Sequence, residues 1–374
     1  MLFYRVLSRR ARPRALGSLE TIRSLSSYPH DSISDSTKSL AEDLLAGKRW
    51  GLAKSITMAE SSKREHKEQA ALLIDYVMEK HYDSAPVSSI DLENRLFPRG
   101  QTLRLGVAGP PGAGKSTFIE MLGCELIQRS HRVAVIPVDP SSHISGGSIL
   151  GDKTRMDVLS RSKDAYVRAS PTSGVLGGIA EHTNDVISLC EAANFDVIIV
   201  ESVGLGQSEV DIDQAVDMLL VLVPPGGGDG LQASKKGIME AADLVLINKA
   251  DGTLLSQAKH TKADYSGAMA FVRRKHEEWK PFVLMISSKE GRGLDTVLET
   301  IQDFHVTMTT NRALPNKRLS QAVHWMWGSF RHTVIKEAEG NSRVKAKAAL
   351  VQADLALGRV NPRSAARALL KELD

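Results

Sequence analysis

The sequence contains little cysteine and no long uninterrupted apolar segment. Its 374 residues include only two cysteines, Cys124 and Cys190, which excludes a disulfide-rich scaffold and a cysteine-rich zinc site. No uncharged apolar run approaches the roughly 18 residues of a membrane-spanning helix, so we expect no membrane insertion. The histidines show no H-x-x-x-H or H-E-x-x-H grouping, and G-x-S-x-G is missing, so neither a catalytic zinc site nor a serine nucleophile is indicated.

The net charge of +4 is unevenly distributed along the chain. The first 30 residues hold six arginines against one glutamate, whereas the remaining 344 residues hold 42 basic and 43 acidic side chains. The basic balance therefore gives no reason to expect nucleic-acid binding. A start that is rich in arginine and serine and poor in acid is typical of a mitochondrial transit peptide. We predict a transit peptide and linker over residues 1–35, and location in the mitochondrial matrix.

The rest of the chain divides by its hydrophobic pattern into three parts. Residues 36–98 have apolar positions at helical spacing, and residues 312–374 are again helical. Between them, residues 99–311 alternate short apolar runs with amphipathic stretches, which predicts an α/β fold with a doubly wound, mostly parallel sheet. The six expected strands are Leu103–Ala108, Val133–Val138, Val197–Val200, Met218–Val223, Leu244–Ile247 and Phe282–Ile286.

A phosphate-binding loop follows the first expected strand and precedes a helical stretch. Glycines in such a loop let backbone N–H groups surround phosphate oxygens, and the helix presents its positive N-terminus to the anion. The lysine can reach the β- and γ-phosphates, and the serine hydroxyl can bind Mg²⁺. The motif G-x-x-x-x-G-K-[ST] comprises Gly109, Pro110, Pro111, Gly112, Ala113, Gly114, Lys115, Ser116 and Thr117.

A second motif predicts recognition of guanine. Asn248, Lys249 and Asp251 form N-K-x-D directly after an apolar run, at the strand end where open parallel sheets bind ligands. The Asp251 carboxylate can accept from the ring N1–H and the exocyclic amine of guanine, and adenine offers no such pair of donors. Ser287, Ser288 and Lys289 follow the last strand, where a backbone N–H can meet the guanine oxygen. Together these residues favour GTP and GDP over ATP.

Three carboxylates are candidates for the magnesium region together with Ser116. Asp139 and Glu201 end neighbouring expected strands, and Asp152 lies in the glycine-containing segment between them. Oxygen ligands of this kind suit Mg²⁺. Glu201 is the best candidate because it begins an E-x-x-G sequence, whose Gly204 N–H could sense the γ-phosphate. We expect Lys115 and Glu201 to be the catalytic residues, and Gln207 to be a candidate for positioning water.

Several long strings go beyond a generic GTPase and resemble the MeaB/ArgK-type family of P-loop GTPases. These are DPSS, SGGSILGDKTRM, ESVGLGQSE, GGGDGLQASKKGIME, NKAD and HWMW, in that order along residues 39–374. The resemblance implies a GTP-hydrolysing chaperone of methylmalonyl-CoA mutase, which gates adenosylcobalamin loading and protects or reactivates the mutase. It further implies homodimerisation through the C-terminal helices. Lys235 and Lys236 would lie in a third switch that couples the mutase to hydrolysis.

The chain departs from the family pattern at two positions. Ser202 stands where the family usually has threonine, and Gly230 stands where it usually has glutamate, so the third switch lacks one carboxylate. Two other functions remain open from the residues themselves. One is a P-loop kinase for a small molecule or protein, against which NKAD argues. The other is a non-hydrolysing GTP switch for a different metallocofactor client.

Overall fold

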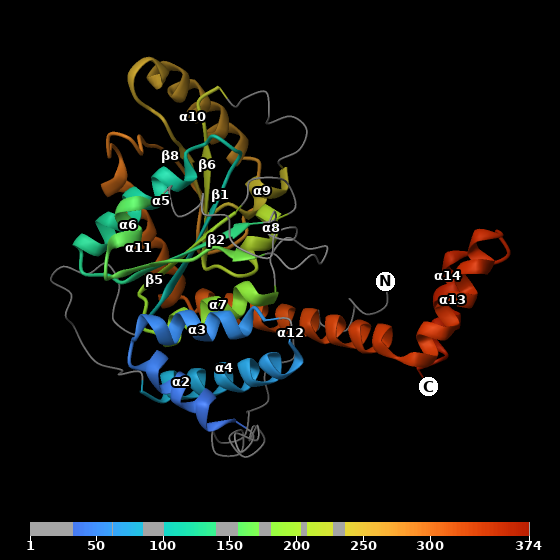
Figure 1. Cartoon of the computed structure of the whole chain (residues 1–374). Helices are drawn as coiled ribbons and strands as arrows, with labels where there is room; N and C mark the ends of the chain where they lie inside the picture. The colour runs from blue at the N-terminus through green and yellow to red at the C-terminus, as the bar shows by residue number, and fades with distance from the viewer. Residues whose placement is uncertain are drawn as a thin grey trace. The chain divides into compact units, whose positions relative to one another are not determined.

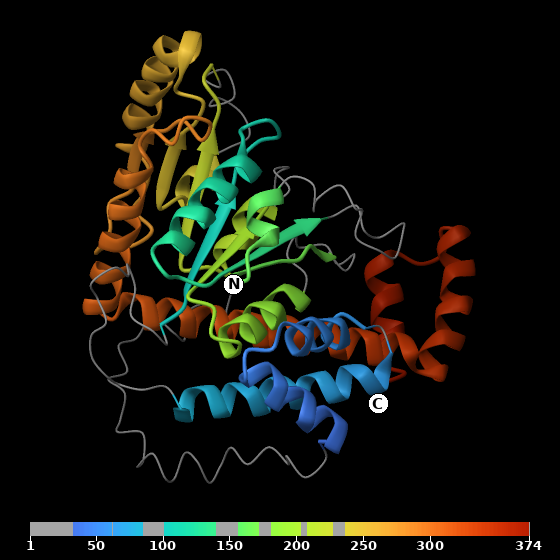
Figure 2. The ribbon, with the colours of Figure 1, turned by 60° about the vertical axis from the view of Figure 1, so that its left-hand side comes forward.

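The computed structural model describes residues 33–61, 63–84, 101–139, 156–171, 181–202, 208–226 and 236–373. The chain divides into two compact units, Met1–Pro86 and Val87–Asp374. No helix among the described residues combines the length and the hydropathy needed to cross a membrane. Figure 1 shows the helices and strands with their labels, and Figure 2 shows the same ribbon turned by 60°.

The described part of the first unit consists of three helices, α2 (Asp35–Leu45), α3 (Arg49–Ala59) and α4 (Arg64–Ser84). Helix α2 begins at Asp35, where the Ser34 hydroxyl accepts a hydrogen bond from the Thr37 N–H, at 3.2 Å, and so caps it. The helices pack on one another through their apolar faces. The buried aliphatic side chains include Leu40, Leu44, Leu52, Ile56, Leu73 and Val77, all at the helical spacing of the sequence.

The second unit is built on an eight-stranded sheet in which every strand pair is parallel. Its order is β3-β2-β5-β1-β6-β7-β8, and β4 pairs separately with β2. The doubly wound parallel fold predicted from the sequence is confirmed. The strands are β1 (Leu103–Ala108), β2 (Val133–Asp139), β3 (Ala165–Val167), β4 (Ser170–Pro171), β5 (Val197–Glu201), β6 (Met218–Val223), β7 (Leu244–Ile247) and β8 (Phe282–Met285).

Helices cover both faces of this sheet, which is why its central strands are apolar throughout rather than alternating. Helices α5 (Lys115–Gln128), α6 (Asp157–Arg161) and α11 (Leu294–Thr310) share one hydrophobic core with the strands. Helices α7 (Glu181–Ala192), α8 (Ser208–Asp213) and α9 (Lys236–Ala241) lie on the opposite face (Figure 1). A short 3₁₀ turn, Gly252–Leu254, precedes helix α10 (Leu255–Met269), which contacts β7 and β8.

Helix α8 lies unusually close to the central strand. A Cβ atom added to Gly106, in the middle of β1, would lie 2.7 Å from Ile212 Cγ2 and 2.9 Å from Val216 Cγ2. Such a distance is shorter than any ordinary carbon contact, so only glycine allows this approach. The position of α8 is therefore fixed against β1 by direct packing.

The chain ends in three helices, α12 (Ala313–Gly340), α13 (Ser342–Ala356) and α14 (Pro362–Leu370). Only Asn311 and Arg312 separate α11 from α12. Arg312 has a left-handed backbone (φ 57°), and its N–H donates to the Thr309 carbonyl at 3.0 Å. The Asn311 amide donates to the Thr307 carbonyl at 2.9 Å. The junction is thus a tight, fully hydrogen-bonded corner.

Candidate functional site

Because all strands are parallel, their carboxyl ends meet at one edge of the sheet, and most of the predicted site residues follow those ends. The phosphate loop follows β1, Glu201 ends β5, Asn248 follows β7 and Ser287 lies two residues after the end of β8. Strand register pairs Val107 of β1 with Glu201, so the loop and this carboxylate leave the sheet at the same level. Open parallel sheets bind ligands at this edge.

Two glycines of the phosphate loop are required by its backbone. Gly109 has φ 142°, and a Cβ atom there would lie 2.2 Å from the Leu222 carbonyl oxygen of β6. Gly114 has φ 87°, caps helix α5, and would place a Cβ atom 2.6 Å from Asn248 Nδ2. Any other residue would open the loop at both places. The loop therefore delivers the N-terminus of the 14-residue α5 to the edge of the sheet.

Lys115 lies at the first turn of α5 and folds back over the loop. Its ammonium donates to the carbonyls of Gly109, at 2.8 Å, and Pro110, at 3.4 Å, and the residue is only 9% exposed. The positive charge is thereby held above the loop's own backbone. A phosphate group bound in the loop would meet this ammonium and the helix N-terminus together.

Ser116 and Glu201 lie side by side at the mouth of the loop. The Ser116 hydroxyl donates to Glu201 Oε1 at 3.1 Å, and both residues are partly exposed. A hydroxyl and a carboxylate are the hard oxygen donors that Mg²⁺ prefers, so this pair fits the cofactor expected for the site. Among the described residues, no group of three His, Cys, Asp or Glu side chains could hold a metal ion by itself.

Asn248 joins the phosphate loop to the base-recognition loop. Its side-chain N–H donates to the Ala113 carbonyl at 2.8 Å, while its side-chain oxygen accepts from the Ser288 N–H, at 3.0 Å, and hydroxyl, at 2.8 Å. The residue is 1% exposed, so these hydrogen bonds lie out of water. The two loops are held in one arrangement by a single amide.

Asp251 lies beside the turn that follows β8. The Ser287 hydroxyl donates to Asp251 Oδ2, and it accepts from the Glu290 N–H at 3.1 Å. The Ser287 N–H donates to the Arg292 carbonyl at 3.0 Å, which closes the turn. The second oxygen of Asp251 is not engaged in this pattern, so the carboxylate keeps accepting capacity for a base edge.

Lys249 has a left-handed backbone (φ 57°), and its side chain runs toward the phosphate loop. Its Cε atom is 3.9 Å from the position that a Cβ of Gly114 would take. The aliphatic stem therefore covers the loop from the side of the base-recognition motif. Such a position brings a lysine stem into contact with whatever ring is bound between the loops.

Six of the predicted residues lie wholly or partly outside the described part of the chain. Asp152, Gly204, Gln207 and Lys235 fall outside the described residues, and the side chains of Asp139 and Lys236 are likewise not described. Asp139 ends β2 in the register that places Pro137 opposite Glu201. Thr117 is exposed on the first turn of α5.

The Ala113 carbonyl and Arg292 were not predicted from the sequence. Ala113 contributes to the site through its backbone oxygen, which no side-chain pattern reports. Arg292 donates from Nη1 to the Ala250 carbonyl at 3.4 Å and so connects the loop after β7 with the Ser287 turn. Ala113 itself lies within the predicted phosphate-binding motif, whereas Arg292 lies outside the predicted motifs.

Comparison with known proteins agrees with this site. The sequence profile of the family described as methylmalonyl Co-A mutase-associated GTPase MeaB matches residues 52–343. The mouse protein named methylmalonic aciduria type A homolog, mitochondrial, is 42% identical over 330 residues, which cover 88% of this chain and 77% of that protein. The Escherichia coli (strain K12) GTPase ArgK is 43% identical over 298 residues, which cover 80% of this chain and 85% of that protein.

A solved structure has the same fold over nearly the whole chain. The crystal structure of a protein titled LAO/AO transport system kinase superposes with a TM-score of 0.66 at 32% sequence identity, and covers 91% of this chain and 99% of that one. Fold, phosphate loop and base-recognition motif agree with the sequence relatives. This chain belongs to the MeaB family of P-loop GTPases.

Proposed function

We propose that this chain binds GTP at the carboxyl edge of its sheet and hydrolyses it to GDP and phosphate. The observation that carries the proposal is the hydrogen bond from Ser116 to Glu201, which sets a hydroxyl and a carboxylate beside the Lys115 ammonium. The residues that bind the nucleotide are proposed to be Gly109–Thr117 for the phosphates and Asn248, Lys249, Asp251 and Ser287–Lys289 for the base.

In hydrolysis, the chain's own groups hold the phosphates and stabilise the charge that builds on them. Lys115 exchanges its loop carbonyls for phosphate oxygens, and the loop N–H groups donate to the same oxygens. Ser116 and Glu201 would hold Mg²⁺, with Asp139 and Asp152 as further candidates, and the ion would neutralise charge between the β- and γ-phosphates. Glu201 leads directly to Gly204 and Gln207, which we propose sense the γ-phosphate and orient the attacking water.

We propose that the client of this GTPase is methylmalonyl-CoA mutase. The family's description and the names of relatives support this, as do the switch strings in the sequence. The chain would gate loading of adenosylcobalamin and protect or reactivate the mutase, with Lys235 and Lys236 transmitting contact with the mutase. The arginine-rich start and the relatives named as mitochondrial support location in the mitochondrial matrix.

The decisive experiment measures GTP hydrolysis by the purified chain with and without methylmalonyl-CoA mutase. We expect slow turnover alone and faster turnover with the mutase. An unchanged rate would count against the client. Binding of GTP with no release of phosphate would instead support a non-hydrolysing switch, and transfer of labelled phosphate to an acceptor other than water would support a kinase.

We also propose that α12 forms the homodimer face. Six of its exposed apolar side chains follow a helical repeat along one side: Leu319, Val323, Met326, Trp327, Phe330 and Val334. Continuous apolar surface of this kind is typical of subunit interfaces. Phe330→Asp should convert a dimer to a monomer in light scattering, whereas Lys336→Asp, on another side of the helix, should leave the dimer intact. A monomeric wild-type chain would disprove this arrangement.

A further inference from the structure

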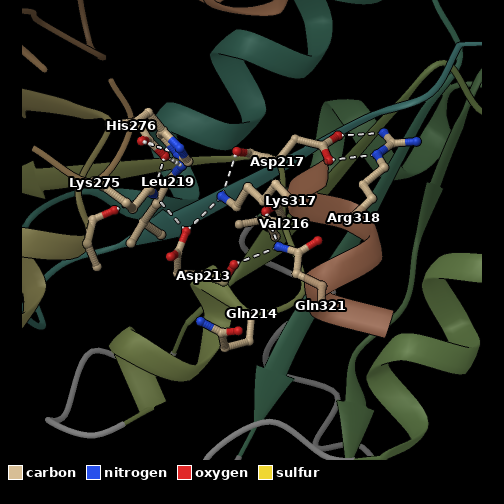
Figure 3. A network of polar contacts seen from close by, with 12 residues as sticks. Asp213, Gln214, Val216, Asp217, Leu219, Lys275, His276, Lys317, Arg318 and Gln321 are labelled. Atoms are coloured by element: carbon tan, nitrogen blue, oxygen red, sulfur yellow. Dashed lines mark hydrogen bonds and ion pairs between the residues drawn. The ribbon is translucent and has the colours of Figure 1, made fainter. Parts of the chain in front are cut away.

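Helix α12 is joined to the end of α8 by a cluster of partly and fully buried polar side chains, which Figure 3 shows. Lys317 Nζ donates to Asp213 Oδ1 at 2.9 Å and to the Asp217 carbonyl at 2.8 Å. Arg318 forms two hydrogen bonds with the Asp217 carboxylate, from Nε at 2.8 Å and from Nη2 at 2.6 Å. We call Asp213, Asp217, Lys317, Arg318, Gln321 and Trp325 the α8–α12 clasp.

The clasp holds backbone as well as side chains. The Gln321 amide is buried and donates to the carbonyls of Asp213 and Val216, both at 2.8 Å. The Trp325 indole N–H donates to the Gln214 carbonyl at 2.7 Å. Together with Lys317, these side chains bind four backbone carbonyls between Asp213 and Asp217. They can do so together because a helix places residues 317, 321 and 325 on one face.

The charges of the clasp are arranged to stay ionised. Burial alone would raise the pKa of Asp213, but Lys317 and Lys275 lower it below its ordinary value. Lys275 Nζ donates to Asp213 Oδ1 at 2.8 Å and to Asp243 Oδ2 at 2.7 Å. Asp213 thus has two cationic partners, and the loss of Lys317 alone leaves it paired within the core.

Helix α8 connects this clasp to the proposed hydrolytic site. Its six residues begin at Ser208, and only residues 203–207 lie between it and Ser202, which follows Glu201. The Ser202 N–H donates to the Val107 carbonyl at 2.9 Å, so the chain is fixed on that side of the segment. The close packing of Ile212 against Gly106 and the clasp fix it on the other side.

We propose that Lys317, Gln321 and Trp325 are positioning residues for GTP hydrolysis. By fixing the end of α8, the three side chains of α12 hold Ile212 and Val216 against Gly106 of β1, the strand that leads into the phosphate loop. This inference rests on the proposed GTPase function and adds to it a set of residues remote from the nucleotide.

The test compares Lys317→Ala with Lys336→Ala in the full-length protein. Both variants remove one cation from α12, and Lys336 is exposed. We expect Lys317→Ala to lower kcat for GTP hydrolysis about tenfold, as small displacements of positioned groups do, with KM and the Kd for GDP changed less than about twofold. Lys336→Ala should match the wild type, and Lys317→Arg should restore most of the rate.

A second variant separates positioning from stability. Trp325→Phe keeps an aromatic ring and removes the pyrrole part of the indole with the N–H that binds the Gln214 carbonyl. Like Lys317→Ala, it should lower kcat without a loss of GDP affinity. Equal rates for Lys317→Ala and the wild type, a matching loss in Lys336→Ala, or a parallel loss of GDP affinity would each overturn the proposal.

Hydrogen exchange of the α8 amides gives a readout that does not depend on turnover. With GDP bound, the amides of Ser208–Asp213 should exchange at least severalfold faster in Lys317→Ala than in the wild type, while those of β7 stay protected. If the wild type binds GTP but never hydrolyses it, the proposed function fails, and the exchange rates still report whether the clasp fixes α8. Unchanged exchange in α8 would reject the clasp even in an active GTPase.

Discussion

The side-chain amide of Asn248 donates to the backbone carbonyl of Ala113 at 2.8 Å, and this bond joins the guanine motif to the phosphate loop. The same side chain accepts two hydrogen bonds from Ser288. Three separate segments, after β1, β7 and β8, therefore depend on one buried residue for their spacing. Both halves of a nucleotide would be bound across that spacing.

Asn248→Ala should weaken GDP binding by about tenfold or more and lower the Tm. The change leaves the Ser288 N–H and the Ala113 carbonyl without their partner, and each buried unsatisfied group costs about 1–3 kcal/mol. Titration with a fluorescent GDP analogue and thermal unfolding measure the two effects. Asn316→Ala, an exposed substitution on α12, serves as the control and should change neither.

Asp251→Asn should exchange guanine for xanthine as the preferred base. The carboxylate accepts from two guanine donors, whereas an amide presents an N–H that the xanthine carbonyl can accept. We expect GTP affinity to fall about a hundredfold and xanthosine triphosphate affinity to rise. Competition binding with both nucleotides is the measurement. Equal loss of both would mean that Asp251 supports the loop without reading the base.

Lys115→Ala should reduce GTP affinity by about a hundredfold or more. The ammonium donates to two carbonyls of the loop, and charge-assisted hydrogen bonds contribute about 1.5–3 kcal/mol each. Calorimetric titration with GTP measures the loss. Lys259→Ala, an exposed lysine of α10, should bind normally, and retention of full affinity by Lys115→Ala would show that the phosphates bind elsewhere.

Asp217→Asn should destabilise the second unit by about 3–5 kcal/mol, the usual result of breaking a buried ion pair on one side. The carboxylate is fully buried, accepts from Arg318 and from the Arg104 N–H at 2.8 Å, and its pKa is lowered by these arginines against the effect of burial. Urea unfolding followed by tryptophan fluorescence gives the change. Asp354→Asn removes an exposed partner of Arg359 and should cost less than about 1 kcal/mol.

The fold should become less stable as the pH falls below about 6.5, because His305 is buried. Burial lowers the pKa of His305 below its ordinary value of 6.5, and Asp217 opposes that shift only in part. Below pH 6.5 the unfolded chain binds a proton that the folded chain still excludes, so the free energy of unfolding falls with pH. Tm measured from pH 7.5 to 5.5 should fall less steeply in His305→Gln than in the wild type, while the exposed His260→Gln should follow the wild type.

The sequence predicted the sheet well because its central strands are continuous apolar runs bounded by glycine, proline and polar turns. It did not predict β3 (Ala165–Val167) or β4 (Ser170–Pro171). These strands have three and two residues, which are too few to show an alternation of buried and exposed side chains. They form because they pair with the edge of β2.

The sequence indicates candidate residues where they lie in a short motif, and it does not indicate contacts between distant parts of the chain. Lys115, Ser116, Glu201 and Asp251 lie in motifs with fixed spacing. The clasp joins Asp213 to Lys317, which are 104 residues apart in the sequence. A local sequence pattern cannot predict an ion pair between segments so far apart. The function of Asn248 as a link to Ala113 likewise depends on a backbone carbonyl that any residue could have supplied.

The two-residue corner at Asn311 and Arg312 limits how this family can evolve. An α-helix turns by about 100° per residue, so one residue inserted into α12 before Lys317 would point the Lys317 ammonium away from Asp213. It would rotate the exposed apolar side chains of α12 by the same angle. Selection should therefore tolerate substitutions in this stretch far better than insertions or deletions. The number of residues from Phe304, buried in the core, to Lys317 should stay constant among relatives that retain a GTP-dependent activity. A change in that number would mark relatives in which helix α12 has a different function.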